Sequence, residues 1–233
     1  MNWDVLIGID VGSSSCKVSA VDSRGTVVAT AQDNYATRYP RPGWAEQNPQ
    51  EWYSVACSTT AECMRNGGLA PGRVAALAVD GPAHNVALLD GDGTVLRPTL
   101  HWSDLRSFEQ ARRLESDHGA LIEKATLQNP NPSWTLAQLL WLKEAEPETW
   151  ERLACFLVTK DYVRFRLTGE PLTDRYDAIG TQLYDVEKDS WSTDIASLLG
   201  LRTEALPRVA EPHDTAGGLR EDAASAMGLL PGT

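Results

Sequence analysis

A carboxylate, a glycine and a pair of serines directly follow an apolar run near the start of the chain. The apolar run covers residues 5–9, and the polar residues include Asp10, Gly12, Ser13 and Ser14. A glycine lets backbone N–H groups approach an anion closely, and serine hydroxyls add donors. A carboxylate at the end of a strand suits hydrated Mg²⁺, which takes few protein ligands. The segment therefore predicts a phosphate-binding turn, although the same residues are typical of an ordinary β-turn.

Two common phosphate-binding motifs are absent from this segment. The P-loop pattern Gly-x4-Gly-Lys-Ser/Thr does not occur there, and neither does the dinucleotide pattern Gly-x-Gly-x-x-Gly. An alternating apolar run at residues 17–21 follows the turn, where both of those motifs would have a helix. The start of the chain is therefore predicted to be a hairpin whose two strands are joined by the polar turn.

Further apolar patterns predict the elements that hold this turn. Residues 26–31 predict a third strand of an antiparallel meander, and residues 49–65 predict a helix that starts with a proline. The continuous apolar run at 74–79 predicts a strand buried on both faces, which ends in the loop 81–85. Ligands in α/β sheets bind at the carboxyl ends of strands, so Asp10 and this loop are expected to share a site.

The remaining sequence alternates helical patterns with short strands, which indicates an α/β fold with a mixed central sheet flanked by helices. A hairpin is expected across residues 86–96, around a turn at 90–93. Residues 176–183 are expected to be loop and short strand. Helices are expected at about 105–116, 120–127, 134–145, 147–153, 160–167, 193–199 and 223–229, with a buried strand at 155–158.

Composition excludes several classes of protein. The net charge of −11 argues against a general nucleic-acid binder, which needs a basic face. No apolar stretch approaches the roughly 20 residues that span a bilayer. The four cysteines show neither a Cys-x-x-Cys pair nor zinc spacing, and three lie in apolar patterns typical of buried free thiols. A soluble cytoplasmic protein that binds neither nucleic acid nor membrane is the simplest interpretation.

Six segments then form an ordered set of motifs. They are residues 8–17, 43–52, 81–84, 102–106, 160–170 and 177–181. This order resembles the FGGY family of carbohydrate kinases, and within it the xylulokinase-like branch. In that family the second segment reads Trp-x-Glu-Gln-Asp-Pro-x-x-Trp and the fourth reads Trp-x-Asp-x-Arg. The sugar loop departs from the family pattern Gly-Gln-Met-His, because Pro82 and Ala83 replace glutamine and methionine.

The resemblance implies a ribonuclease-H-like domain of the actin and sugar-kinase superfamily. It also implies ATP- and Mg²⁺-dependent phosphorylation of a sugar hydroxyl, with a ketopentose such as D-xylulose as the expected acceptor. Residues 1–233 would be the N-terminal, sugar-binding domain. The C-terminal nucleotide-binding domain, which carries the aspartate base in this family, would be absent from this chain. The chain alone is therefore expected to lack useful kinase activity.

The resemblance also assigns roles to individual residues. Asp10 would be the catalytic residue that holds hydrated Mg²⁺ or positions the γ-phosphate. The phosphates of the ATP cofactor would lie along Gly12, Ser13, Ser14 and Lys17, and the sugar would contact Ala83, His84 and Asp104.

Each role has a structural alternative. Lys17 is also typical of a solvated strand residue, and His84 of a loop histidine bonded to backbone. Asp104 is equally suited to capping the helix that follows it. Trp44, Trp102 and Trp134 are candidates for a pocket wall, although core packing is the safer interpretation in a chain with eight tryptophans.

Two other functions compatible with the sequence are a glycerol- or other polyol-type kinase and a non-catalytic actin-fold module that binds sugar. The Arg-Glu pair that glycerol kinases carry at the sugar loop is replaced here by His84 and Asn85. A domain without its partner lobe exposes apolar surface, so a homodimer is a further expectation.

Overall fold

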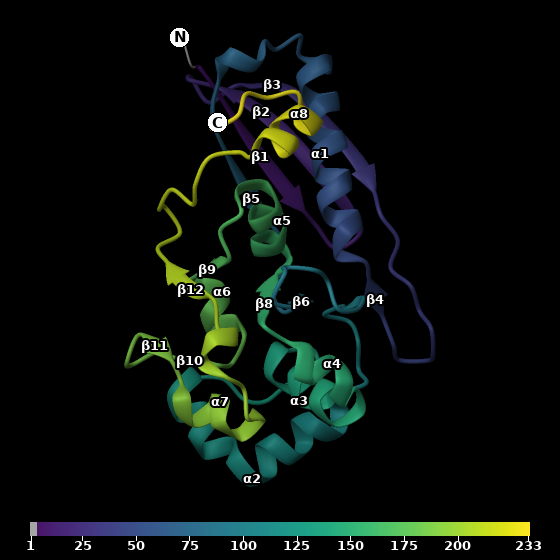
Figure 1. The fold of residues 1–233 in the computed structure, drawn as a ribbon, viewed down its shortest axis with the longest axis vertical. Helices are drawn as coiled ribbons and strands as arrows, with labels where there is room; N and C mark the ends of the chain where they lie inside the picture. Colours follow the sequence, from purple (N-terminus) through teal and green to yellow (C-terminus); the bar gives the residue numbers. More distant parts are fainter. Residues whose placement is uncertain (1–3) are drawn as a thin grey trace.

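A computed structural model describes residues 4–233 (Figure 1). A four-stranded sheet and three helices form the end of the molecule that holds the C-terminus. The opposite end is mainly helical and contains short two-stranded ladders.

The sheet contains β1 (Val5–Val11), β2 (Ser15–Asp22), β3 (Val27–Asn34) and β5 (Val74–Asp80), in the order β3-β2-β1-β5. The first three strands form an antiparallel meander, and β5 pairs parallel to β1. The predicted meander and mixed sheet are therefore confirmed.

One face of the sheet is covered by α1 (Pro49–Asn66), α5 (Thr159–Thr168) and α8 (Glu221–Met227). Alternate residues of β1 point to this face and are buried there, Ile7 and Ile9 among them. Helix α1 starts as predicted, because the Asn48 side chain accepts a hydrogen bond from the backbone N–H of Gln50.

The other face of the sheet is open in the described structure. Leu6 is 54% exposed, and Gly8 and Asp10 follow it on the same face of β1. The prediction that residues 74–79 are buried on both faces is wrong, because Ala75, Ala76 and Ala78 are exposed. Strand β5 pairs only with β1 among residues 4–233, so its second edge has no neighbouring strand.

Four short ladders and five helices build the rest of the molecule. The ladders pair β6 with β8, β4 with β7, β9 with β12 and β10 with β11. Their bounds are β4 (Glu46–Gln47), β6 (Val86–Leu89), β7 (Thr99–Leu100), β8 (Cys155–Val158), β9 (Leu172–Asp174), β10 (Tyr184–Asp185), β11 (Ser190–Trp191) and β12 (Arg208–Ala210). The helices are α2 (Phe108–Thr126), α3 (Thr135–Ala145), α4 (Pro147–Arg152), α6 (Arg175–Gly180) and α7 (Thr193–Leu199), and Pro71–Arg73 and Thr203–Ala205 form single 3₁₀ turns.

Three local predictions are corrected by the structure. Helix α2 continues through Gly119, where two separate helices were expected, because its apolar face packs on α3. Residues 175–180 form α6 instead of a loop, because the Asp174 side chain caps that helix. The 86–96 hairpin forms in part: the turn at 90–93 is present, and the Leu96 N–H donates to the Leu88 carbonyl beside the Leu89–Val95 bridge. Its second arm forms no strand of its own, and the ladder of β6 is with β8.

Two further features concern the chain as a whole. Among the helices that the structure describes, none combines the length and the apolar character that crossing a bilayer requires. All four cysteines are free, three of them buried and Cys155 half-buried.

Candidate active site

The carboxyl ends of β1 and β5 lie side by side. In the parallel register of these strands, Asp10 is the partner of Asp80. The serine turn at 12–15 leaves the first strand and the loop 81–85 leaves the second, so both predicted ligand-binding segments start from one edge of the sheet. The predicted meeting of the two segments is confirmed. The position of Asp80 beside Asp10 was missed, although Asp80 directly follows the apolar run at 74–79.

The turn between β1 and β2 is tight and exposes its hydroxyls. The Gly12 N–H donates to the Ser15 carbonyl at 2.9 Å, and a Cβ on Gly12 would lie only 3.1 Å from the same oxygen. The buried Tyr35 hydroxyl donates to the Gly12 carbonyl, and this hydrogen bond ties the turn to the core. Ser13 and Ser14 are exposed, so their hydroxyls are accessible to an anion.

Two side chains from distant motifs hold Ser13 in place. Gln47 Nε2 donates to the Ser13 carbonyl at 2.7 Å, and the Gln47 amide oxygen accepts from Trp52 Nε1 at 3.0 Å. Trp102 Nε1 donates to Ser13 Oγ at 3.0 Å. Sequence reasoning singled out both motifs but missed these bonds, since only the fold brings Gln47 and Trp102 to this turn.

Asp10 and Lys17 are cross-strand partners in the β1–β2 ladder and are both exposed. Partners in a ladder point to the same face, so a carboxylate and an ammonium stand next to each other on the open face of the sheet. No residue among 4–233 forms a hydrogen bond or ion pair with the Asp10 carboxylate. This donor set suits a hydrated divalent cation at Asp10 and a phosphate oxygen at Lys17.

The loop after β5 approaches the turn closely. A Cβ on Gly81 would lie 3.2 Å from the Val11 carbonyl oxygen, so a larger residue there would push the two segments apart. His84 has a positive φ of 69°, and its ring stacks on Trp134 with centroids 4.7 Å apart. Gly180 lies against Ala83 and His84, and a Cβ at position 180 would be in ordinary van der Waals contact with both residues.

The environment of His84 favours its neutral form. Burial lowers the pKa of the imidazole, and the nearby Gly180 backbone opposes this shift. Nδ1 is buried and makes no well-formed hydrogen bond within residues 4–233. A neutral imidazole carries one donor and one acceptor, which suits pairing with sugar hydroxyls.

Asp104 occupies a buried structural position. Its side chain is 1% exposed, and Oδ2 accepts from the Ala45 N–H at 2.6 Å and from Arg106 Nη2 at 2.8 Å. Oδ1 accepts from the Arg106 N–H at 2.9 Å. The N-cap of α2 is Ser107, so the capping alternative for Asp104 is wrong. No oxygen of this carboxylate faces open space. The expected contact between Asp104 and a sugar stays a prediction.

Arg106 links the buried Asp104 to the aromatic residues that pack around the 43–52 segment. Its guanidinium lies 3.6 Å from the Trp44 ring centroid, and Nη1 lies 2.8 Å from Glu46. Trp44 also packs edge-on against Trp141. Trp44 is therefore a packing residue of this cluster, which joins the 43–52 segment to the 102–106 segment.

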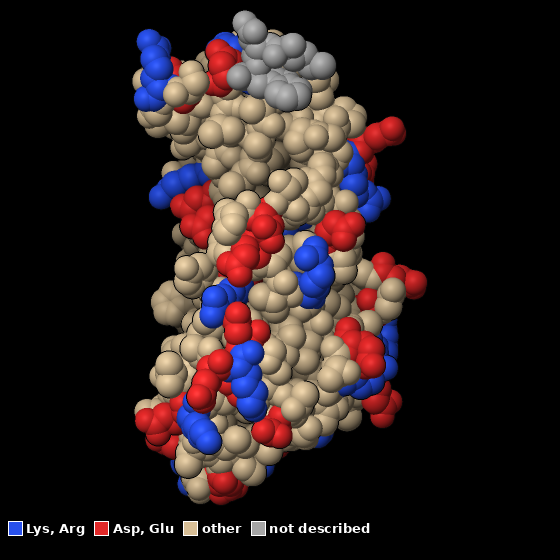
Figure 2. Space-filling view, turned by 90° about the vertical axis from the view of Figure 1, so that its left-hand side faces the viewer, with Lys and Arg blue, Asp and Glu red and all other residues tan. Residues whose placement is uncertain are grey.

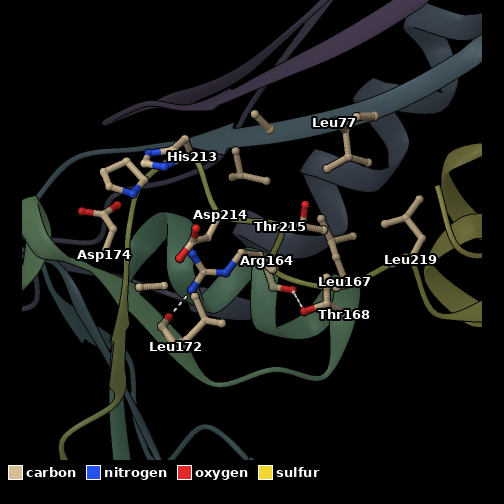
Figure 3. Close-up of a pocket in the computed structure, with 18 of the residues that line it drawn as sticks. Leu77, Arg164, Leu167, Thr168, Leu172, Asp174, His213, Asp214, Thr215 and Leu219 are labelled. Atoms are coloured by element: carbon tan, nitrogen blue, oxygen red, sulfur yellow. Dashed lines mark hydrogen bonds between the residues drawn. The ribbon is translucent and has the colours of Figure 1, made fainter.

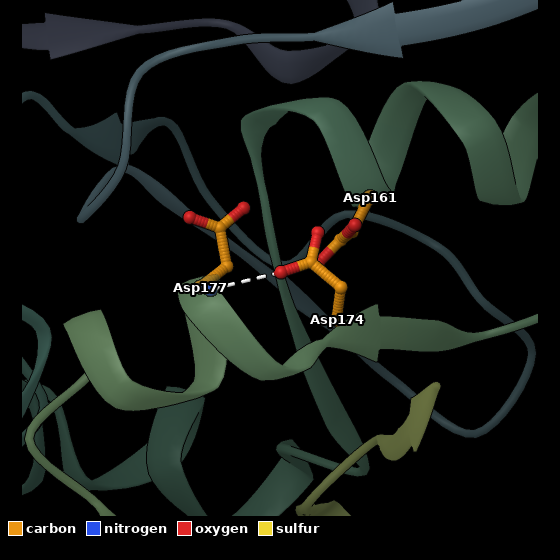
Figure 4. Close-up of side chains that lie close together, drawn as sticks. All are labelled: Asp161, Asp174 and Asp177. Atoms are coloured by element: carbon orange, nitrogen blue, oxygen red, sulfur yellow. Dashed lines mark hydrogen bonds between the residues drawn. The ribbon is translucent and has the colours of Figure 1, made fainter. Parts of the chain in front are cut away.

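Three carboxylates cluster on α5, β9 and α6 (Figure 4). Lys160 supplies the positive charge that these carboxylates share. Its Nζ lies 2.7 Å from Asp161, 2.6 Å from Asp174 and 2.8 Å from Asp177. Burial by itself would lower the pKa of the Lys160 ammonium. The Asp161 and Asp177 carboxylates have the larger combined effect, so the pKa of Lys160 is raised. The cluster ties α6, which supports His84, to α5.

A groove of about 910 Å³ runs along the free edge of β5 (Figure 3). Leu77 forms one wall, Leu167 and Leu172 form the floor, and residues 210–219 form the other wall. Neither the serine turn nor the loop 81–85 lines it. The groove is therefore separate from the candidate active site, which lies at the carboxyl ends of the strands.

Residues 5–233 match the N-terminal domain of the FGGY family of carbohydrate kinases. This chain belongs to that family. The predicted fold of the actin and sugar-kinase superfamily agrees with this membership, since the structural neighbours are sugar kinases as well.

Named relatives of this FGGY chain are xylulose kinases. The xylulose kinase of Bacillus subtilis is 35% identical over 98% of the chain and 46% of the relative. That of Escherichia coli is 33% identical over 96% of the chain and 46% of the relative. The crystal structure of a xylulose kinase from Rhodospirillum rubrum superposes with a TM-score of 0.94 at 29% identity, covering 98% of this chain and 47% of the other. The chain thus spans about half the length of the curated relatives it matches.

The buried position of Asp104 predicts a loss of stability when its charge is removed. Asp104→Asn leaves the buried Arg106 guanidinium with Glu46 as its remaining carboxylate partner and weakens the charge-assisted hydrogen bonds to Asp104, so the free energy of unfolding should fall by about 1.5 to 3 kcal/mol. Glu109→Gln is the matched control, because it removes an exposed ion pair with Arg112 and should change stability by under about 1 kcal/mol. Urea denaturation measures both. An Asp104→Asn variant as stable as the wild type, but unable to bind sugar, would contradict the structural role.

The lowered pKa of His84 predicts a pH dependence of stability. The folded protein holds this ring neutral, whereas in the unfolded chain it protonates near pH 6.5. Between pH 7 and 5 the wild type should therefore lose stability relative to His84→Gln. Burial also lowers the pKa of His101, but that effect is common to both proteins and cancels. An NMR titration that gives His84 a pKa at or above 6.5 would contradict this account.

Proposed function

We propose that this chain is the sugar-binding half of an ATP-dependent sugar kinase whose acceptor is a ketopentose, D-xylulose. One observation carries the proposal. In a chain of the FGGY family, the parallel pairing of β1 with β5 brings Asp10 and the serine turn to the same edge as His84. A phosphate donor and a sugar acceptor would meet at this edge.

Phosphoryl transfer depends on alignment and on neutralising charge more than on covalent chemistry. The exposed Asp10 carboxylate has the chemistry to hold hydrated Mg²⁺, and that ion would neutralise phosphate charge. The Ser13 and Ser14 hydroxyls would donate to phosphate oxygens, and Gly12 leaves room for close approach. Lys17 stands opposite Asp10 and would add a second positive charge.

The acceptor would lie against the loop 81–85. His84 is held by stacking on Trp134, and its neutral ring would pair with a sugar hydroxyl. Ala83 lies beside Gly180, so these two small residues leave more room than methionine would in the family pattern. The named xylulose kinase relatives favour D-xylulose over a polyol.

A second lobe would complete the enzyme, as the family resemblance implies. The curated relatives are about twice as long as this chain, and their names describe whole kinases. The sheet also has an open face and an open edge. In Figure 2 the centre of the upper part of the molecule is uncharged, with charged side chains at its margins and further down. We propose that a C-terminal lobe packs here, binds ATP and supplies the base that takes the proton of the sugar hydroxyl.

Two other expectations remain proposals. A second copy of the chain is the alternative occupant of the open face, so self-association of this chain alone stays a prediction. The free cysteines suit a reducing compartment, and we propose the cytoplasm as the location.

The proposal predicts different kinetic defects for two substitutions in an enzyme extended past Thr233 by its coding sequence. Asp10→Ala should lower kcat by about 10²-fold or more, because an aligned charge acts in the transition state. His84→Ala should mainly raise the KM for D-xylulose, about tenfold, because a binding hydrogen bond is lost. A coupled ADP-release assay over a panel of ketoses, aldoses and polyols measures both.

His118→Ala is the control, since this histidine is exposed on α2 and should leave both constants unchanged. The 233-residue chain alone should produce no sugar phosphate. Full activity of both site variants would reject the site, and a polyol preferred over every ketose would reject the acceptor.

A further inference from the structure

We propose that Trp102 is a positioning residue that couples the serine turn to the sugar loop. Through it, phosphate bound at Ser13 and sugar bound beside His84 would strengthen each other's binding. This inference rests on the proposed function, because it concerns the same two ligands. It adds a role for a residue that would otherwise be only a pocket wall.

The two N–H groups of Trp102 point to the two halves of the site. Its indole Nε1 donates to Ser13 Oγ at 3.0 Å, and its backbone N–H donates to Asn85 Oδ1 at 2.6 Å. Asn85 is fully buried and directly follows His84. One residue therefore bridges the turn after β1 and the loop after β5, which are about 70 residues apart in the chain.

The indole also determines in which direction the Ser13 hydroxyl can donate its own proton. A serine hydroxyl has one proton to donate and two lone pairs that accept. Because Oγ accepts the indole proton, its own proton must point elsewhere, and it has no acceptor within residues 4–233. Trp102 thus leaves the Ser13 hydroxyl as a donor for an anion.

No other side chain in the described structure holds this hydroxyl. Gln47 binds the Ser13 carbonyl instead, and it does so from a buried position behind the turn. The residues on either side of Trp102 are anchored, since the His101 N–H donates to the Ala45 carbonyl and Asp104 is buried in its own cluster. The backbone N–H of Trp102 itself depends on Asn85 for its hydrogen bond.

Trp102 as a residue is 44% exposed, so a bound ligand can contact it. A sugar that orders the loop 81–85 would hold Asn85, and with it Trp102, in the position that orients Ser13. By thermodynamic reciprocity, phosphate at Ser13 must then favour sugar binding by the same factor.

The experiment measures the Kd of D-xylulose for the 233-residue chain by calorimetry, with and without saturating inorganic phosphate. In the wild type, phosphate should tighten sugar binding about three- to tenfold, which is the range expected for one hydrogen bond. Trp102→Phe keeps an aromatic ring but loses the indole N–H, so phosphate should no longer affect the Kd. Trp191→Phe is the matched control, because it removes an indole bond to the Pro207 carbonyl far from the site and should keep the wild-type response.

A double-mutant cycle identifies the bond responsible. Ser13→Ala should abolish the response to phosphate, and adding Trp102→Phe should cause no further loss. A phosphate response retained in Trp102→Phe would overturn the coupling, and so would a wild type that binds xylulose equally with and without phosphate. A wild type that binds no xylulose would overturn the proposed function instead, and the coupling with it.

Discussion

The parallel pairing of β1 with β5 is the constraint on which the candidate site depends. Two parallel neighbours end at the same edge of a sheet, so Asp10 and Asp80 become partners although 70 positions separate them. The loops that leave these strands must then start side by side. Gly81 permits that approach, because any side chain there would press on the Val11 carbonyl. Every chemical role assigned above follows from this juxtaposition.

A buried polar cluster around Asp104 and Arg106 fixes the two segments whose side chains hold the serine turn. Asp104 and Arg106 pair at 1% exposure, and the guanidinium also contacts Glu46 and the Trp44 ring. Removing two such charges from water is costly unless hydrogen bonds saturate them, and here most donors and acceptors are paired. The cluster therefore acts through geometry. It fixes the 43–52 and 102–106 segments, from which Gln47 and Trp102 reach Ser13.

Much of the fold could be predicted from the sequence, because local patterns determine local elements. The Asn48 cap defines the start of α1, an apolar run defines β1, and alternation defines β2. Predictions failed where distant parts decide the outcome. Continuous apolar sequence cannot reveal that β5 has a free edge, and a helical pattern cannot reveal that α2 continues through Gly119. In the site, residue types predicted Asp10, Ser13 and His84. The bonds made by Trp102 and the burial of Asp104 arise from tertiary contacts that the sequence does not show.

The central claim is that phosphate and sugar meet where β1 and β5 end. Backbone amide NMR on the ¹⁵N-labelled chain tests it directly, with D-xylulose and Mn²⁺ added separately. Xylulose should shift amides centred on His84, and Mn²⁺ should broaden amides centred on Asp10, so that the two affected sets adjoin across the ends of these strands. Broadening centred on the Asp161, Asp174 and Asp177 cluster, or shifts confined to the groove beside Leu77, would contradict the account.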